Sequence, residues 1–190
     1  LLPDGGAETA PDFPFAEIPH GKQSWYGPLG GIWQTVTLEA RDHRHLEHCA
    51  INADLRSGAV TLSLELSGPC AGCSVSVSVT GPDGSKTAEV SKVISAARET
   101  VSLQVPAVKP WSPDTPHLYR ARIDIRADGQ VIDSTTHSFG FRSFEAREGK
   151  FFLNGEPFYM RGALDQDYYP EGICTPPSVE FLEDQIHKAK

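Results

Sequence analysis

The sequence lacks long apolar runs and is short of positive charge. No stretch approaches 18 consecutive apolar residues, so we expect no membrane-spanning helix and no membrane partner. Lys and Arg total 17 against 25 Asp and Glu, which gives a formal net charge of -8. Because an acidic surface does not attract phosphate backbones, we expect no nucleic-acid partner either.

The N-terminus lacks the features of a secretion signal. It reads Leu1-Leu-Pro-Asp-Gly-Gly, without the basic and apolar regions of a signal peptide, and it does not begin with Met. We expect that a targeting segment was removed or that an upstream domain precedes these residues. The compartment stays open between the cytoplasm and the periplasm or exterior.

Cysteine is scarce, with four residues, Cys49, Cys70, Cys73 and Cys174. The Cys70–Cys73 spacing is typical of a metal or redox pair, but a zinc site needs two more ligands, and the sequence has no second pair at that spacing. A thioredoxin-like motif would lie between a strand and a helix, whereas this pair precedes a strand-like run. We expect incidental cysteines, with a local disulfide and then a metal site as the alternatives.

Three histidines, His43, His45 and His48, form a loose cluster in a charged loop. We interpret this segment as a solvated connection rather than a metal site. No cofactor is expected.

Between residues 41 and 140 the sequence alternates between apolar and polar residues in seven short segments separated by turn residues. This pattern is typical of an immunoglobulin-like sandwich, in which a second sheet covers the apolar face of each strand. In the second segment, for example, Val60, Leu62, Leu64 and Leu66 are expected to point inward. The predicted strands are residues 48–55, 59–66, 74–80, 87–93, 99–105, 117–126 and 131–139.

Further elements are predicted before and after these seven strands. Residues 31–39 alternate and predict a strand, and residues 150–158 predict a hairpin around Asn154-Gly155. Residues 159–163 predict a short buried strand, and Ser178 is a plausible N-cap for a helix that follows. This order of strand, loop and helix is how a (β/α) barrel begins.

The segment before the sixth strand is rich in proline. Pro110, Pro113 and Pro116 prevent regular pairing and predict an extended loop. We expect Trp111 to pack this loop against the sandwich, with a binding role as the alternative.

Four motifs resemble glycoside hydrolase family 2, which contains β-galactosidases, β-glucuronidases and β-mannosidases. They occur in the order in which that family has them and cover most of the chain. The motifs are Gly30-Gly-Ile-Trp-Gln-Thr-Val36, Trp111-Ser-Pro-Asp-Thr-Pro-His-Leu-Tyr119, Phe139-Gly-Phe-Arg142, and Phe152-Leu-Asn-Gly-Glu-Pro157 with Arg161-Gly162.

The resemblance implies a mainly β chain with three parts. Residues 1–40 would be the end of a jelly-roll sugar-binding domain, and residues 41–142 an immunoglobulin-like β-sandwich. Residues 143–190 would be the first βα unit of a (β/α)8 catalytic barrel. The chain departs from the family's pattern at two places. Gln34 replaces the usual Arg after the Gly-Ile-Trp segment, and Gln166 and Asp167 occur where many members have His and Glu.

The resemblance further implies a retaining glycosidase that uses two glutamates on later barrel strands. Neither family motif that contains them occurs before Lys190, so we assign no catalytic residue and expect the 190 residues alone to be inactive. Glu171 in a Pro-Gly loop and Glu180 in a helix's first turn are rejected as catalytic acids.

Six residues are candidates for contact with a carbohydrate substrate. Their side chains offer hydrogen-bonding groups for sugar hydroxyls and flat faces for sugar rings. The alternatives are structural, because the two acids could cap a loop, the aromatic residues could pack between elements or domains, and the arginine could form an ion pair. The candidates are Trp25, Arg161, Asp165, Gln166, Asp167 and Tyr168, with Tyr26 and Tyr169 beside them.

Three functions follow from this reading. The first is part of a glycoside hydrolase acting on β-linked glycosides, with the rest of its own catalytic chain as partner and homo-oligomers left open. The second is a non-catalytic immunoglobulin-like spacer. The third is a carbohydrate-binding module, which the polar outward faces of the strands disfavour because they form no aromatic platform.

Overall fold

The computed structural model describes residue 32 and residues 35–164, 169, 172 and 175–190. Within these residues, strands β1 to β10 lie in one compact unit, Glu39–Arg161, and helix α2 (Val179–Ala189) lies in a second unit. None of the helices in the described residues is long and apolar enough to cross a membrane.

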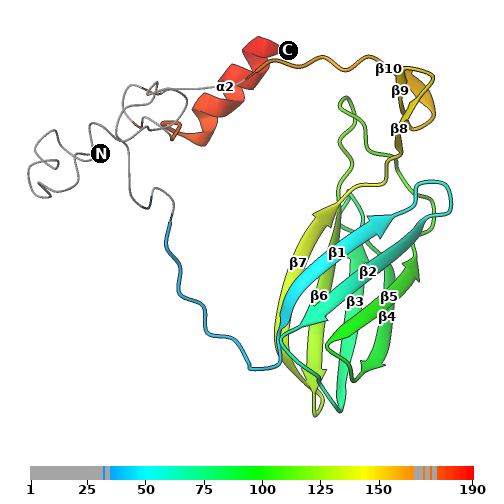
Figure 1. The fold of residues 1–190 in the computed structure, drawn as a ribbon, viewed down its shortest axis with the longest axis vertical. Helices are drawn as coiled ribbons and strands as arrows, with labels where there is room; N and C mark the ends of the chain where they lie inside the picture. The colour runs from blue at the N-terminus through cyan, green and yellow to red at the C-terminus, as the bar shows by residue number, and fades with distance from the viewer. Residues whose placement is uncertain (1–31, 33–34, 165–168, 170–171, 173–174) are drawn as a thin grey trace, which may run out of the picture. The chain divides into compact units, whose positions relative to one another are not determined.

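Seven strands of the first unit form two antiparallel sheets, one with the order β1-β2-β5 and the other with the order β4-β3-β6-β7 (Figure 1). The two sheets make a sandwich, so the mainly β class and the immunoglobulin-like architecture are confirmed. No strand end departs from its predicted position by more than two residues. The bounds are β1 Leu46–Ala53, β2 Ala59–Leu66, β3 Cys73–Thr80, β4 Lys86–Ile94, β5 Arg98–Gln104, β6 Tyr119–Ala127 and β7 Gln130–Phe139.

The core lies between the two sheets and consists of alternate residues of their strands. Leu62 of β2, Val77 of β3 and Ile123 of β6 are all buried in one apolar cluster. The side chains between them point outward, because successive residues of a strand face opposite sides of the sheet. The predicted inward set of β2, Val60, Leu62, Leu64 and Leu66, is buried without exception.

Two predicted strands are absent from the described residues. Residues 35–39 have no regular structure, and the side chains of Val36 and Leu38 are exposed. Residues 159–163 are also irregular, and Tyr159 and Met160 are exposed rather than buried. An alternating or apolar segment becomes a strand only when a neighbour completes its backbone hydrogen bonds. No described strand lies beside either segment.

The expectation of incidental cysteines is wrong for Cys70 and Cys73, which form a disulfide with their Cα atoms 5.5 Å apart. Both side chains are buried in the core, and the bond closes the turn that leads into β3. The backbone N–H of Cys73 also donates to the carbonyl of Cys70 at 3.1 Å, which brings the two residues together. Cys49 is a free thiol whose pKa is raised by burial.

A third, smaller sheet follows the sandwich, with the order β10-β9-β8. Its strands are β8 Phe144–Arg147, β9 Lys150–Leu153 and β10 Glu156–Phe158. The predicted hairpin around Asn154-Gly155 is therefore confirmed, and both turn residues have the positive φ angles, 54° and 86°, that such a two-residue turn requires. The sequence analysis did not predict β8.

The proline-rich loop is held against the end of β7, and Trp111 is its anchor as predicted. The backbone N–H of Trp111 donates to the carbonyl of Phe141 at 2.8 Å, and the Arg142 guanidinium lies 4.8 Å from the centre of the indole ring. Gly140 allows this contact, because a Cβ there would lie 3.1 Å from the Trp111 Cβ. Beneath the loop, Phe141 packs edge-on against the buried Tyr119 ring at 5.0 Å.

Asn154 joins the small sheet to both of these segments. Its side-chain oxygen accepts from the Ser143 backbone N–H at 3.1 Å, and its side-chain amide donates to the Trp111 carbonyl at 3.0 Å. Its own backbone N–H donates to the Ser143 carbonyl at 2.9 Å. One side chain thus connects the proline-rich loop, the segment after β7 and the hairpin turn, which we call the Asn154 junction.

Glu99 connects the two sheets at another point. Its carboxylate accepts from the Lys92 ammonium at 2.8 Å and from the backbone N–H groups of Ser95 and Ala96 at 3.1 and 3.2 Å. The side chain is only 12% exposed. These donors, led by Lys92, lower the pKa of Glu99 from 4.5 to about 2.

We predict that Glu99→Gln makes stability less dependent on pH. Because the folded pKa lies below the unfolded one, Glu99 stabilises the fold above about pH 4.5 and loses that contribution as the pH falls toward 2. The variant should therefore be less stable than the parent at pH 6, and the gap should shrink below pH 4.5. Urea unfolding at several pH values measures it, with Glu47→Gln on the exposed side of β1 as the control. A gap that is constant with pH contradicts the assignment.

We predict that Asn154→Ala lowers the free energy of unfolding by about 1–3 kcal/mol more than Asp128→Ala does, because it removes two tertiary hydrogen bonds and leaves their partners unpaired. Asp128 is a matched control, since it also has positive φ, 51°, in a turn followed by glycine. Its side chain makes no hydrogen bond within the described part of the chain. Urea unfolding measures both variants, and equal losses would show that the turn conformation, not the junction, accounts for the effect.

Candidate functional site

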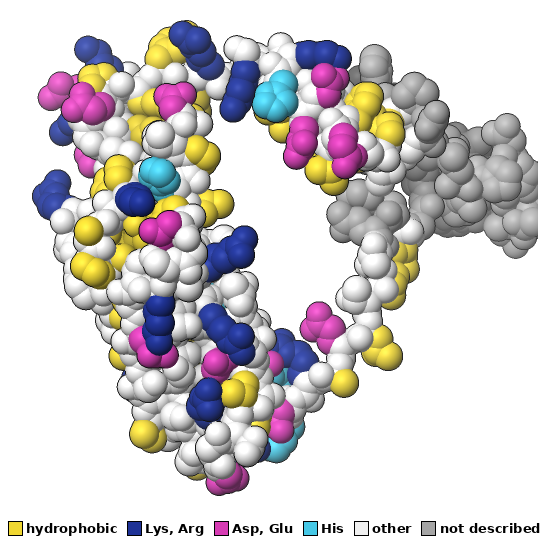
Figure 2. All heavy atoms as spheres, turned by 180° about the vertical axis from the view of Figure 1, so that it is seen from behind, with side chains coloured by type: hydrophobic (Ala, Val, Ile, Leu, Met, Phe, Trp, Pro, Cys, Tyr) yellow, Lys and Arg dark blue, Asp and Glu magenta, His cyan; other side chains and the backbone are white. Residues whose placement is uncertain are grey.

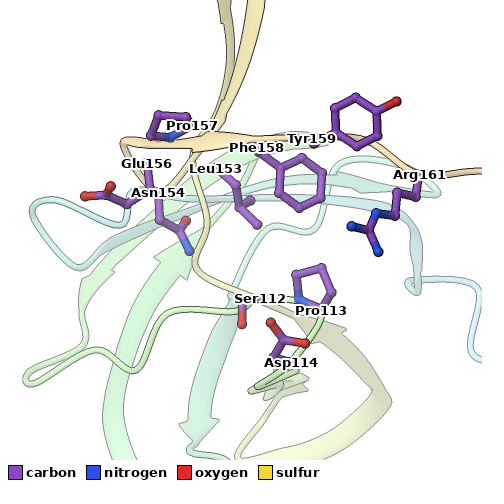
Figure 3. Close-up of a pocket in the computed structure, with 10 residues that line it drawn as sticks. All are labelled: Ser112, Pro113, Asp114, Leu153, Asn154, Glu156, Pro157, Phe158, Tyr159 and Arg161. Carbon is purple, nitrogen blue, oxygen red and sulfur yellow. The ribbon is translucent and has the colours of Figure 1, made fainter. Parts of the chain in front are cut away.

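A groove lies beside the Asn154 junction, between the proline-rich loop and the β9–β10 hairpin (Figure 3). Its volume is about 590 Å³. The lining combines an apolar floor with charged and polar groups at the rim. It consists of Ser112, Pro113, Asp114, Leu153, Asn154, Glu156, Pro157, Phe158, Tyr159 and Arg161.

The loop side of the groove is a rigid turn. The Thr115 backbone N–H donates to the Ser112 hydroxyl at 3.0 Å, and the Ser112 backbone N–H donates to the Thr115 carbonyl at 3.0 Å. Proline at position 113 restricts the turn further, because its ring fixes φ. The turn presents Pro113 and Asp114 toward the hairpin, as Figure 3 shows.

The hairpin side contributes Leu153 and Phe158, whose side chains point toward Pro113 and Asp114 in Figure 3. The turn residue Asn154 sets this orientation, because its bonds to Ser143 and Trp111 fix the hairpin against the loop. The groove therefore lies between apolar side chains of the hairpin and a loop that carries Pro113 and Asp114, and hydrogen bonds hold it within one compact unit, Glu39–Arg161.

Arg161 is the one predicted substrate-binding residue that lines the groove. Its side chain is exposed and lines the groove. No acid among the described residues forms an ion pair with it, so the acid partner that a buried guanidinium requires is not found there. In chemical terms, the guanidinium is available to bind a carboxylate or a hydroxyl oxygen.

The other candidates divide into two groups. Trp25, Tyr26, Asp165, Gln166, Asp167 and Tyr168 lie outside the described residues. Tyr169 is buried, and its ring packs edge-on against Phe181 of α2 with centroids 5.9 Å apart. A buried ring of this kind is part of the packing around α2.

Glu180 lies in the first turn of α2, as predicted. Hydrogen bonds from its own backbone N–H and from Ser178 lower its pKa. A general acid at neutral pH needs a raised pKa, so this environment is opposite to the one that catalysis requires. Ser178 is the N-cap of the helix, and its hydroxyl accepts from the Phe181 backbone N–H at 3.2 Å.

The three histidines of the cluster differ in their surroundings. Both His43 and His45 contact Asp42, the first through its carboxylate at 3.2 Å and the second through its backbone carbonyl at 2.7 Å. His48 lies farther along, in β1. Among the described residues, no three His, Cys, Asp or Glu side chains are grouped so that they could hold a metal ion.

The groove was not predicted from the sequence. Asp114 belongs to the proline-rich loop, and Asn154 and Phe158 belong to the predicted hairpin. Two of the four family-like motifs, the one at residues 111–119 and the one at residues 152–157 with Arg161, supply most of the residues that line the groove. Their spacing along the chain does not indicate that these two segments lie side by side.

Comparisons with known proteins place this fold in a family. The sequence model of "Glycosyl hydrolases family 2" matches residues 44–142, which is more than half of the chain. The chain is 27% identical over 179 residues to a beta-galactosidase of Thermoanaerobacter pseudethanolicus, covering 90% of this chain and 24% of that protein. It is also 27% identical over 144 residues to a beta-galactosidase of Lactobacillus delbrueckii subsp. bulgaricus, covering 74% of this chain and 14% of that protein.

Solved structures agree at the level of the fold. The beta-glucuronidase of Parabacteroides merdae is similar with a TM-score of 0.52 and 22% identity, covering 62% of this chain and 16% of that one. The chain thus spans between one seventh and one quarter of the length of the curated relatives described above. From the match to the family model and from the sandwich fold, we conclude that the chain belongs to glycoside hydrolase family 2.

Proposed function

We propose that these residues form the immunoglobulin-like domain and the start of the catalytic barrel of a longer, retaining glycosidase that hydrolyses β-linked glycosides. The observation that carries this proposal is the family match over residues 44–142. The Asn154 junction supports it, because it brings three of the four family-like motifs into one rigid unit.

In this proposal the chemistry lies outside the 190 residues. A retaining mechanism needs two carboxyl groups about 5–5.5 Å apart, one as nucleophile and the other as acid and base. We assign neither role to a residue of this chain. The expected substrates are β-galactosides or β-glucuronides, because relatives in both sequence and structure carry those names.

The chain's own contribution to substrate binding would come from the residues after the small sheet and from Trp25 near the N-terminus. Asp165, Gln166 and Asp167 would bind sugar hydroxyls, and Tyr168 and Trp25 would stack on sugar rings. Arg161 would bind a carboxylate close to these residues in the sequence, since its guanidinium has no acid partner among the described residues.

A carbohydrate-binding module is a weaker second candidate. Such a module needs exposed aromatic rings, whereas none of the strands β1 to β7 carries an exposed aromatic side chain. A spacer role is compatible with the sandwich, because the Asn154 junction makes a stiff connection between the sandwich and the small sheet.

Activity assays test the main proposal. The longer enzyme should hydrolyse at least one of the chromogenic β-galactosides, β-glucuronides and β-mannosides, and the 190-residue chain should hydrolyse none. Turnover by the 190-residue chain would contradict the location of the catalytic pair. An inactive longer protein would contradict the glycosidase proposal itself.

We predict that Gln166→Ala in the longer enzyme lowers kcat/KM by about 3- to 10-fold, because it removes one hydrogen bond of about 0.5–1.5 kcal/mol to the sugar. Thr136→Ala, an exposed change on β7, is the control and should leave kcat/KM unchanged. Unchanged kinetics in Gln166→Ala would remove this residue from the substrate site.

A further inference from the structure

One face of the small sheet is mostly apolar. In its register, Phe144 pairs with Leu153, and Phe151 pairs with both Ala146 and Phe158. Because paired residues of antiparallel strands point to the same side, these five side chains share one face. The exposed Glu156, which pairs with Leu153 beside the turn, is the charged residue at the end of this face. We call the set Phe144, Ala146, Phe151, Leu153 and Phe158 the Phe face.

The aromatic rings of the Phe face contact one another but remain open to solvent. Phe144 stacks on Phe151 with centroids 5.4 Å apart and meets Phe158 edge-on at 6.1 Å. Phe144 is 49% exposed and Phe151 is 38% exposed. Leu153 and Phe158 also line the groove beside Pro113, so the proline-rich loop covers only one end of the face.

The exposed surface continues into the segment that follows the sheet. A second hollow, of about 580 Å³, runs along Phe151, Phe158, Tyr159 and Met160. Met160 is 56% exposed. Figure 2 shows hydrophobic side chains among charged ones at the end of the unit that carries this sheet.

The opposite face of the sheet carries one aromatic ring, Phe152, which is partly buried. The Arg147 guanidinium lies 3.9 Å from the centre of that ring, which is a close cation–π contact. The ring on this face therefore has a charged partner within the sheet, whereas Phe144 and Phe151 on the other face remain largely open to solvent. A three-stranded sheet of this size gains little stability until its apolar face is packed.

The exposed apolar area of the Phe face and the adjoining segment indicates what kind of partner can pack against it. A large aromatic side chain can bury about 200 Å², so the exposed parts of Phe144, Phe151, Tyr159 and Met160 together amount to roughly 450 Å². A stable complex between separate molecules buries about 800 Å² on each partner. A patch of this size is too small to hold a second copy but sufficient for a segment of the same chain, because covalent linkage supplies a high effective concentration.

We propose that the Phe face, with Met160, is the surface against which the catalytic part of the same glycosidase chain packs. This inference rests on the proposed function, since it requires the longer enzyme. It adds the side chains that make the contact, and it gives the small sheet a role: it is the platform that joins the sandwich to the catalytic part through the Asn154 junction.

Hydrogen exchange measured by mass spectrometry tests the inference on unmutated protein. Peptides from β8 and β9 should exchange roughly tenfold or more slowly in the longer enzyme than in the 190-residue chain, because packing suppresses local opening. Peptides from the central strand β3 serve as the reference and should exchange alike in both. Equal exchange of β8 and β9 in an active enzyme overturns the inference and leaves the proposed function standing.

A paired substitution gives a second measurement. Phe144→Ser with Phe151→Ser should lower Tm in the longer enzyme but have a much smaller effect in the 190-residue chain, where the rings already face water. Val93→Ser, which changes a 78% exposed residue on the outer side of β4, is the control and should lower Tm in neither. An equal loss in both chains would overturn the inference.

Two further outcomes separate the proposals. If the 190-residue chain dimerises in sedimentation experiments and the paired substitution abolishes the dimer, the Phe face binds a second copy and the inference is wrong. If the longer protein protects β8 and β9 but hydrolyses no glycoside, the packing surface stands and the glycosidase proposal falls.

Discussion

The amide of Asn154 is the interaction on which the arrangement of this chain depends. A sandwich followed by a short hairpin would ordinarily be two elements on a flexible connection. Here one side chain accepts from the Ser143 backbone and donates to the Trp111 carbonyl, 11 and 43 residues away. Because each bond satisfies a backbone group near the core, loss of the amide would leave two groups unpaired. The groove and the Phe face both owe their positions to this junction.

The sandwich and the small sheet differ in how fully their apolar side chains are buried. The sandwich buries its apolar residues between two sheets and keeps hydroxyl and charged side chains outside. In the small sheet, Arg147 lies over Phe152 on one face, and three phenylalanines on the other face are partly open. Among the described residues, the sandwich therefore has a closed core, whereas the small sheet leaves one face open to solvent.

Much of the fold could be predicted from the sequence. Alternation predicted all seven strands of the sandwich within two residues, and Asn154-Gly155 predicted the hairpin. The two predicted strands that failed, at residues 31–39 and 159–163, have suitable patterns but no described neighbour to complete their ladders. The Cys70–Cys73 disulfide was only an alternative to incidental cysteines, because the spacing alone does not indicate that both cysteines are buried at one turn. Of the predicted substrate residues, Arg161 lines the groove, Tyr169 is buried beside α2, and the others lie outside the described residues.

The sequence by itself determined the local features: the strand periods, the inward side chains of β2 and β3, the turn residues and the N-cap at Ser178. These depend on residues within a few positions of one another, so pattern and chemistry suffice to predict them. Only the tertiary structure decided that the proline-rich loop, the end of β7 and the hairpin meet, and that Phe144 and Phe151 are left open. Those outcomes depend on hydrogen bonds and packing between segments far apart in the chain, and no local pattern encodes which distant partner a side chain will find.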